Sequence, residues 1–125
     1  MATIMIVDDE EPVRSVIREI IAGYRSDIDI LEACDGREAV EIMKANHVNM
    51  VFTDIVMPNK SGLDLIMELR DEFPEMPIIA MSGGGGITGR FDYLPIAKLI
   101  GALQIINKPF DNDQIRCAVN DAILQ

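Results

Sequence analysis

The chain has 125 residues, of which 49% are hydrophobic and 26% charged, so we expect a single globular domain over residues 1–125. Its formal net charge of −10 and its scattered basic residues argue against direct binding to nucleic acid. No apolar run approaches the roughly 20 residues that span a bilayer, and none fits a signal peptide, which predicts a cytoplasmic protein without membrane insertion.

Apolar segments with strand-like and helix-like spacing alternate along the chain. The elements expected in chain order are a strand at 3–7, a helix at 12–24, a strand at 28–33, a helix at 35–43, a strand at 48–53, a helix at 63–73, a strand at 77–81, a helix at 93–100, a strand at 103–106 and a helix at 111–123. Asp35 with Glu38, and Asp111, are placed to cap helices. The inward-facing positions expected on the third helix are Leu63, Ile66, Met67 and Phe73.

Strands separated by single helices should be parallel and joined by right-handed crossovers, with helices on both faces of the sheet. This predicts an α/β fold with a doubly wound sheet. Acidic residues in the second strand mark it as an edge, whereas the apolar third, fourth and fifth strands fit burial on both faces. Periodicity alone does not fix the strand order. Cys34 and Cys117 have no close-spaced Cys or His partners and are expected to be small buried residues.

Four of the expected strands are each followed closely by polar residues. These five residues are Asp8, Asp9, Asp54, Ser82 and Lys108. Because the carboxyl ends of parallel strands meet at one edge of a sheet, these five side chains should converge there, where ligands bind in open α/β sheets.

Three carboxylates in one place repel one another, since two unit charges about 4 Å apart cost on the order of 4 kcal/mol at an effective dielectric constant near 20. Lys108 can offset one charge, and a hard divalent cation such as Mg²⁺ can offset two. A carboxylate is ionised at neutral pH and can accept a phosphoryl group without a general base. Ser82 can donate a hydrogen bond to a phosphoryl oxygen.

Four short motifs in order resemble the receiver domains of bacterial two-component response regulators, including the chemotaxis regulators. They are I-V-D-D-E-E-P-V-R at 6–14, D-I-V-M-P-N-K-S-G at 54–62, M-S-G at 81–83 and N-K-P-F at 107–110. The resemblance covers nearly the whole chain. It implies a flavodoxin-like fold with strand order 2-1-3-4-5 and five helices. The chain would be either a stand-alone receiver or one domain of a larger protein.

The same resemblance implies a role for each site residue. Asp54 would be the phosphoacceptor, and Asp9 and Asp54 would bind Mg²⁺ together with the backbone carbonyl of Val56. Asp8 would act through metal-bound water. Lys108 would pair with the phosphoryl group, Ser82 would be the switch hydroxyl, and Pro109 would follow a peptide bond that is often cis.

The implied partners are a histidine kinase or histidine phosphotransfer protein and a downstream protein target. The chain would be a monomer or a weak phosphorylation-dependent dimer. It would not be an enzyme, since its chemistry is confined to gaining and losing its own phosphoryl group.

One residue and one segment depart from the common receiver pattern. Ile105 stands where many receivers carry an aromatic switch residue, so the usual aromatic relay is incomplete. The segment 83–92 holds five glycines and is longer than usual, which predicts that phosphorylation orders this segment and shifts the helix at 93–100.

Three other functions compete with this interpretation. An aspartate-dependent phosphatase of the haloacid dehalogenase kind needs a second acid two residues after the nucleophile, and Val56 stands there. A nucleotide-binding protein would carry a glycine-rich loop after the first strand, which is missing. A receiver-like scaffold that binds proteins without being phosphorylated stays open as the alternative.

Overall fold

The computed structural model describes residues 2–55, 61–82 and 101–123. Its strands are β1 (Ala2–Val7), β2 (Ile28–Ala33), β3 (Met50–Asp54), β4 (Ile78–Ser82) and β5 (Gln104–Asn107), and its helices are α1 (Glu11–Tyr24), α2 (Gly36–Ala45), α3 (Gly62–Glu72) and α5 (Asn112–Ile123). The predicted helix at 93–100 and the glycine-containing segment at 83–92 lie outside the described residues. Among the helices described, none is long and apolar enough to cross a membrane.

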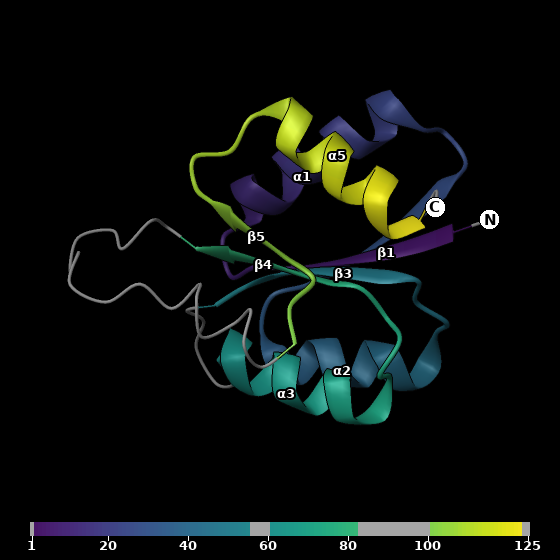
Figure 1. Ribbon diagram of the computed structural model, residues 1–125, viewed down its shortest axis with the longest axis vertical. Helices are drawn as coiled ribbons and strands as arrows, with labels where there is room; N and C mark the ends of the chain where they lie inside the picture. Colours follow the sequence, from purple (N-terminus) through teal and green to yellow (C-terminus); the bar gives the residue numbers. More distant parts are fainter. Residues whose placement is uncertain (1, 56–60, 83–100, 124–125) are drawn as a thin grey trace.

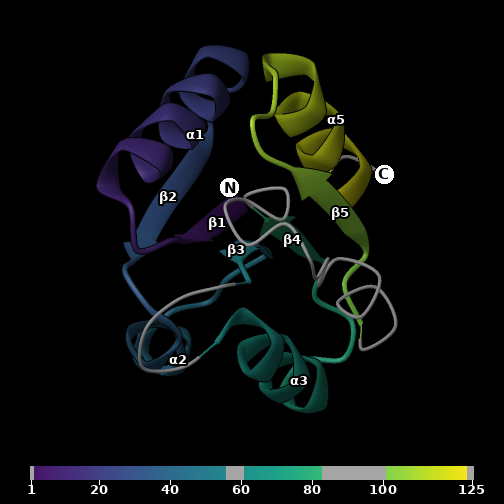
Figure 2. The same cartoon turned by 90° about the vertical axis from the view of Figure 1, so that its left-hand side faces the viewer.

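The five strands form one parallel sheet in the order β2-β1-β3-β4-β5. This confirms the doubly wound fold and the order implied by the receiver resemblance. Helices α1 and α5 cover one face of the sheet and α2 and α3 cover the other (Figure 1, Figure 2). At the carboxyl end of the central strand β1, Val7 lies opposite Ala33 of β2 and Thr53 of β3, so the strand ends are level with one another.

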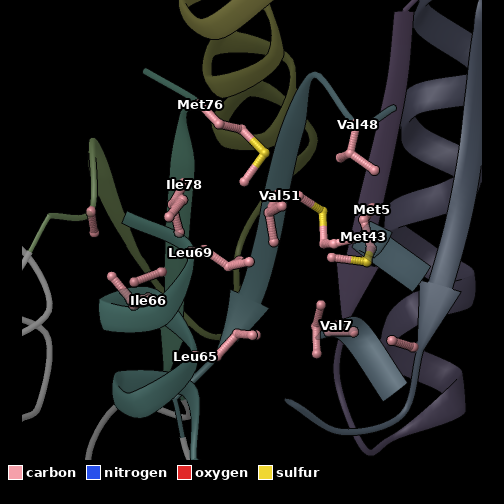
Figure 3. Close-up of a cluster of buried hydrophobic side chains, with 14 of the residues drawn as sticks. Met5, Val7, Met43, Val48, Val51, Leu65, Ile66, Leu69, Met76 and Ile78 are labelled. Atoms are coloured by element: carbon pink, nitrogen blue, oxygen red, sulfur yellow. The ribbon is translucent and has the colours of Figure 1, made fainter. Parts of the chain in front are cut away.

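The sheet separates two apolar layers. One lies against α2 and α3 and contains Val51, Leu65 and Leu69, among others (Figure 3). The other lies against α1 and α5 and includes Phe52 and Ile17. Successive residues of the inner strands point to opposite faces, which explains why β3 and β4 are buried at every position.

Both predicted helix caps are present. The Asp35 side chain accepts a hydrogen bond from the Glu38 backbone N–H at 2.8 Å, at the start of α2. Asp111 and Gln114 cap the start of α5, because each side chain accepts from the other's backbone N–H at 2.9 Å. These bonds satisfy donors that the first helical turn leaves unpaired, so they fix where the two helices begin.

The inward face predicted for the third helix was partly wrong. Met67 is 55% exposed and Phe73 is 36% exposed, while Ile66 is buried as predicted. The buried face of α3 instead consists of Gly62, Leu65, Ile66 and Leu69, spaced at i, i+3, i+4 and i+7.

Two further expectations about burial were wrong. In β5 only Ile106 is buried, because this strand is the second edge of the sheet rather than an inner strand, and Ile105 is exposed. Cys34 and Cys117 are both exposed free thiols rather than buried residues. The prediction that β2 lies at an edge was correct.

Candidate functional site

The sequence-predicted polar residues lie at the carboxyl edge of the sheet. Asp8 and Asp9 follow β1 directly, Lys108 follows β5, and Asp54 and Ser82 are the last residues of β3 and β4. All five strands are parallel, so the chain direction alone brings these strand ends to one side of the molecule.

The Lys108 ammonium joins the two buried carboxylates. Its Nζ lies 2.7 Å from Oδ2 of Asp8 and 3.5 Å from Oδ2 of Asp54. Asp8 is fully buried and Asp54 is 6% exposed. A buried charge is costly unless it is paired, and Lys108 brings one positive charge against both acids, which leaves one negative charge in the pocket for a divalent cation to offset.

Backbone donors hold the second oxygen of each buried carboxylate. Oδ1 of Asp8 accepts from the Glu10 N–H at 2.8 Å, and Oδ1 of Asp54 accepts from the Ile55 N–H at 2.9 Å. The Thr53 hydroxyl donates to the Asp54 carbonyl at 2.9 Å. Both side chains are therefore oriented by their own local backbone, with their Oδ2 atoms toward Lys108.

Burial raises the pKa of Asp54 to about 6, against the lowering effect of the Lys108 charge and with a further raising effect from Asp8. Burial by itself would lower the pKa of Lys108. Its hydrogen bond to Asp8 and the charges of Asp54 and Asp8 outweigh burial, so the pKa of Lys108 lies above its ordinary value. At neutral pH the pocket therefore holds an ionised Asp54 beside a charged lysine.

Three carboxylates lie together where β1 leads into α1. Oxygens of Asp8, Asp9 and Glu10 lie within 4.8 Å of one another, and Asp9 and Glu10 are exposed. Carboxylate oxygens are the ligands that hard divalent cations prefer. The donor set fits Mg²⁺ in its chemistry, whereas Val56, whose carbonyl was expected to contribute, lies outside the described residues. Glu10 was not among the residues predicted for the site. Its position directly after the Asp8–Asp9 pair could have indicated that it belongs to the same acidic cluster.

Ser82 is 5% exposed and ends β4. Its carbonyl accepts from the Lys108 N–H at 2.7 Å, so the backbone ties the hydroxyl-bearing residue to the lysine. The peptide bond between Lys108 and Pro109 is cis, as the resemblance implied.

A sequence profile described as the response regulator receiver domain matches residues 4–120. The chain is 32% identical over 122 residues to probable transcriptional regulator ycf27 of Porphyridium aerugineum, covering 96% of this chain and 47% of that protein. It is 29% identical over 118 residues to sporulation initiation phosphotransferase F of Bacillus subtilis, covering 93% of this chain and 89% of that protein.

Among solved structures, the receiver domain of NtrX from Brucella abortus matches with a TM-score of 0.85 at 27% identity, covering 98% of each chain. The chain spans only 10% to 47% of the length of the autoinducer sensor kinases and the ycf27 regulator that it matches.

Proposed function

Because this chain belongs to the response regulator receiver family, we propose that its Asp54 accepts a phosphoryl group from a histidine kinase or a histidine phosphotransfer protein. A receiver domain is a phosphoacceptor module of two-component and phosphorelay signalling rather than a catalytic enzyme. The observation that carries the proposal is the buried Asp54 carboxylate facing the Lys108 ammonium at 3.5 Å.

The proposed chemistry needs only a nucleophile and compensating charge. Asp54 is ionised above its pKa of about 6, so it requires no general base. A bond forms between an Asp54 carboxylate oxygen and phosphorus as the bond from phosphorus to the donor imidazole nitrogen breaks, and the imidazole keeps the electron pair. Lys108 offsets the charge of the transferred group, and Ser82 donates a hydrogen bond to one of its oxygens.

Mg²⁺ is the proposed cofactor. Asp9, Asp54 and the backbone carbonyl of Val56 would hold it, with Asp8 acting through bound water. When bound, the ion supplies positive charge that offsets both the acidic pocket and the phosphoryl oxygens. The support is the cluster of carboxylate oxygens at Asp8, Asp9 and Glu10, described above.

The phosphodonor would approach over a shallow apolar hollow beside Lys108. This hollow of about 490 Å³ is lined by Pro12, Val13, Val16, Lys108, Pro109 and Phe110. Val16 is 46% exposed there, although the spacing of α1 would allow it to face the core. A Val16→Asp substitution should slow transfer from a protein donor but leave transfer from a small phosphodonor unchanged. Equal slowing with both donors would contradict the docking role.

Phosphorylation is further proposed to change the conformation of residues 83–100 and of a face that they would form with β5 and α5, which would bind a downstream protein. The support comes from the glycine content of 83–92 and from Ser82, the buried residue that precedes this segment. Hydrogen exchange with and without beryllofluoride, a phosphoryl mimic, should show greater protection over 83–100 with the mimic. Unchanged protection there would contradict this switch.

Intact-mass spectrometry tests the phosphoacceptor. We expect one phosphoryl adduct after incubation with Mg²⁺ and acetyl phosphate, absent from Asp54→Asn and retained in Asp29→Asn, which removes an exposed acid from β2. The adduct should be lost at alkaline pH, as expected for an acyl phosphate. A wild-type chain that forms no adduct would instead favour the scaffold function.

A further inference from the structure

Arg14, on the first turns of α1, links the acidic pocket to the edge strand β2. Its Nη1 donates to the backbone carbonyl of Asp8 at 2.6 Å, and its Nε donates to Oε1 of Glu32 at 3.0 Å. The Arg14 side chain is 15% exposed and that of Glu32 is 26% exposed, so this contact is partly buried. The rigid fork of a guanidinium lets one side chain hold two acceptors in a fixed relation.

The peptide units around Asp8 are held from both sides. The Asp8 N–H donates to the Ala33 carbonyl at 3.1 Å, at the end of β2, and the Asp8 carbonyl accepts from Arg14. The carbonyl belongs to the peptide bond that leads into Asp9. Its orientation therefore sets where the exposed Asp9 carboxylate lies relative to the buried Asp8 carboxylate.

We infer that Arg14 is a positioning residue for the acidic pocket, anchored by Glu32. By fixing the peptide between Asp8 and Asp9, it sets the spacing of the carboxylates that would hold a divalent cation. Its positive charge also lies beside the Asp8–Asp9–Glu10 cluster, but position rather than charge is the proposed role. The effect on cation binding rests on the proposed function; the effect on the geometry of Asp8 does not.

The chain offers a matched control in Arg18, one turn further along α1. Arg18 Nη1 pairs with the second oxygen of the same Glu32 carboxylate. Its side chain is 47% exposed, and its described bond is to Glu32 rather than to Asp8. Arg14→Gln and Arg18→Gln therefore remove the same charge and a bond to the same partner, and they differ in the bond to the Asp8 carbonyl.

The first measurement is made without metal. NMR should follow the amide signals and hydrogen exchange of Asp8 and Glu10, because the Glu10 N–H binds the Asp8 side chain. Arg14→Gln should shift both signals and speed their exchange at least several-fold, whereas Arg18→Gln should leave them as in the wild type. Equal behaviour of the two variants would overturn the inference, even if the wild type forms its phosphoryl adduct.

The second measurement is a Mg²⁺ titration of the same proteins. Residues that orient metal ligands typically contribute about 10- to 100-fold to metal affinity, so Arg14→Gln should weaken Mg²⁺ binding by roughly tenfold or more. Arg18→Gln should change it by less than about twofold, as expected for an exposed ion pair. If the wild type binds no Mg²⁺, the proposed cofactor fails, and the metal-free amide measurement still decides the role of Arg14.

A conservative variant separates position from charge. Arg14→Lys keeps the positive charge but lacks the fork that reaches Asp8 and Glu32 together. It should recover less than half of the lost Mg²⁺ affinity on a logarithmic scale; complete recovery would show that charge alone matters and would overturn the inference. If Arg14→Gln does not fold, Glu32→Ala, which removes the oxygens that anchor Arg14, should shift the same two amides in the same direction, and unshifted amides would overturn it equally.

Discussion

A Cβ atom added to Gly62 would lie 2.0 Å from the carbonyl oxygen of Asp54. The Gly62 N–H donates to the Ile55 carbonyl at 2.7 Å, so the first residue of α3 packs directly against the backbone of the proposed phosphoacceptor. Because the obstructing atoms are backbone, no side-chain rotation can relieve the overlap. A residue with no side chain is required where α3 meets the end of β3.

Gly62→Ala should therefore shift α3 or the end of β3. Overpacking of a filled site typically costs about 1 to 3 kcal/mol, and we expect a loss of unfolding free energy in that range, measured by chemical denaturation. The control is Gly23→Ala in α1, where an added Cβ would meet nothing within 4 Å. That change should be neutral or stabilise by up to about 1 kcal/mol. Equal losses in both variants would contradict the close-contact explanation.

Replacing Lys108 should raise the pKa of Asp54 above its value of about 6, because the ammonium favours the ionised carboxylate. Carboxyl ¹³C NMR titration of Lys108→Met would measure the shift. The variant should also lose roughly 3 to 5 kcal/mol of stability at neutral pH, because Asp8 is left buried without its cation. Lys44→Met, at an exposed lysine in the last turn of α2, should do neither. An unchanged pKa in Lys108→Met would show that the ammonium does not govern Asp54.

The raised pKa of Asp54 has a consequence for stability. The native pKa of about 6 exceeds the ordinary value of 3.8, so the native state binds the proton more tightly than the unfolded chain. Ionisation of Asp54 therefore lowers native stability, with the full loss present above the native pKa and absent below the ordinary one.

Asp54→Asn, which cannot ionise, should raise the unfolding free energy by about 1 to 3 kcal/mol near pH 7.5 without Mg²⁺. The gain should shrink near pH 4.5, where the wild-type carboxyl is largely protonated. Denaturant titrations at both pH values would measure it, with Asp29→Asn as the exposed-acid control. A gain that does not depend on pH would contradict the assignment of the raised pKa to Asp54.

Mg²⁺ should stabilise the folded chain, because a ligand that binds only the native state adds about 2.7 kcal/mol at 100 times its dissociation constant. EDTA should reverse the effect, which thermal denaturation would follow. Asp9→Asn should abolish most of the stabilisation. Glu10→Gln removes an equally exposed neighbouring carboxylate of the same cluster and should retain it. If Glu10→Gln instead abolishes the stabilisation and Asp9→Asn retains it, Glu10 rather than Asp9 is the Mg²⁺ ligand.

Much of the fold could be predicted from the sequence because its signals are local. The Asp35 and Asp111 caps mark helix starts, and the alternation of strands and helices requires a parallel sheet. The strand order could not be derived in this way; it came from the resemblance to receivers. The rotation of α3 was mispredicted because Gly62, which sets it by packing on the Asp54 carbonyl, carries no apolar signal.

The candidate site was predictable for the same reason, since residues at the ends of parallel strands must converge. The side-chain contacts that orient and charge-balance the site could not be predicted. These contacts depend on side-chain conformations that reach from one element to another. They decide that Lys108 lies nearer to Asp8 than to Asp54 and that Arg14 reaches the Asp8 carbonyl. The exposure of Cys34 and Cys117 likewise depends on which helix and strand faces meet solvent.

The bond between Lys108 and Asp8 joins residues 100 positions apart in the chain. A nascent chain that has not yet added β5 would hold the acids of β1 and β3 without this cation, since a contact between residues so distant in sequence requires the whole intervening chain to close into a loop. If Asp54 accepts a phosphoryl group as proposed, a partly folded molecule would lack the lysine that offsets the charge of that group, and only the completed domain would react.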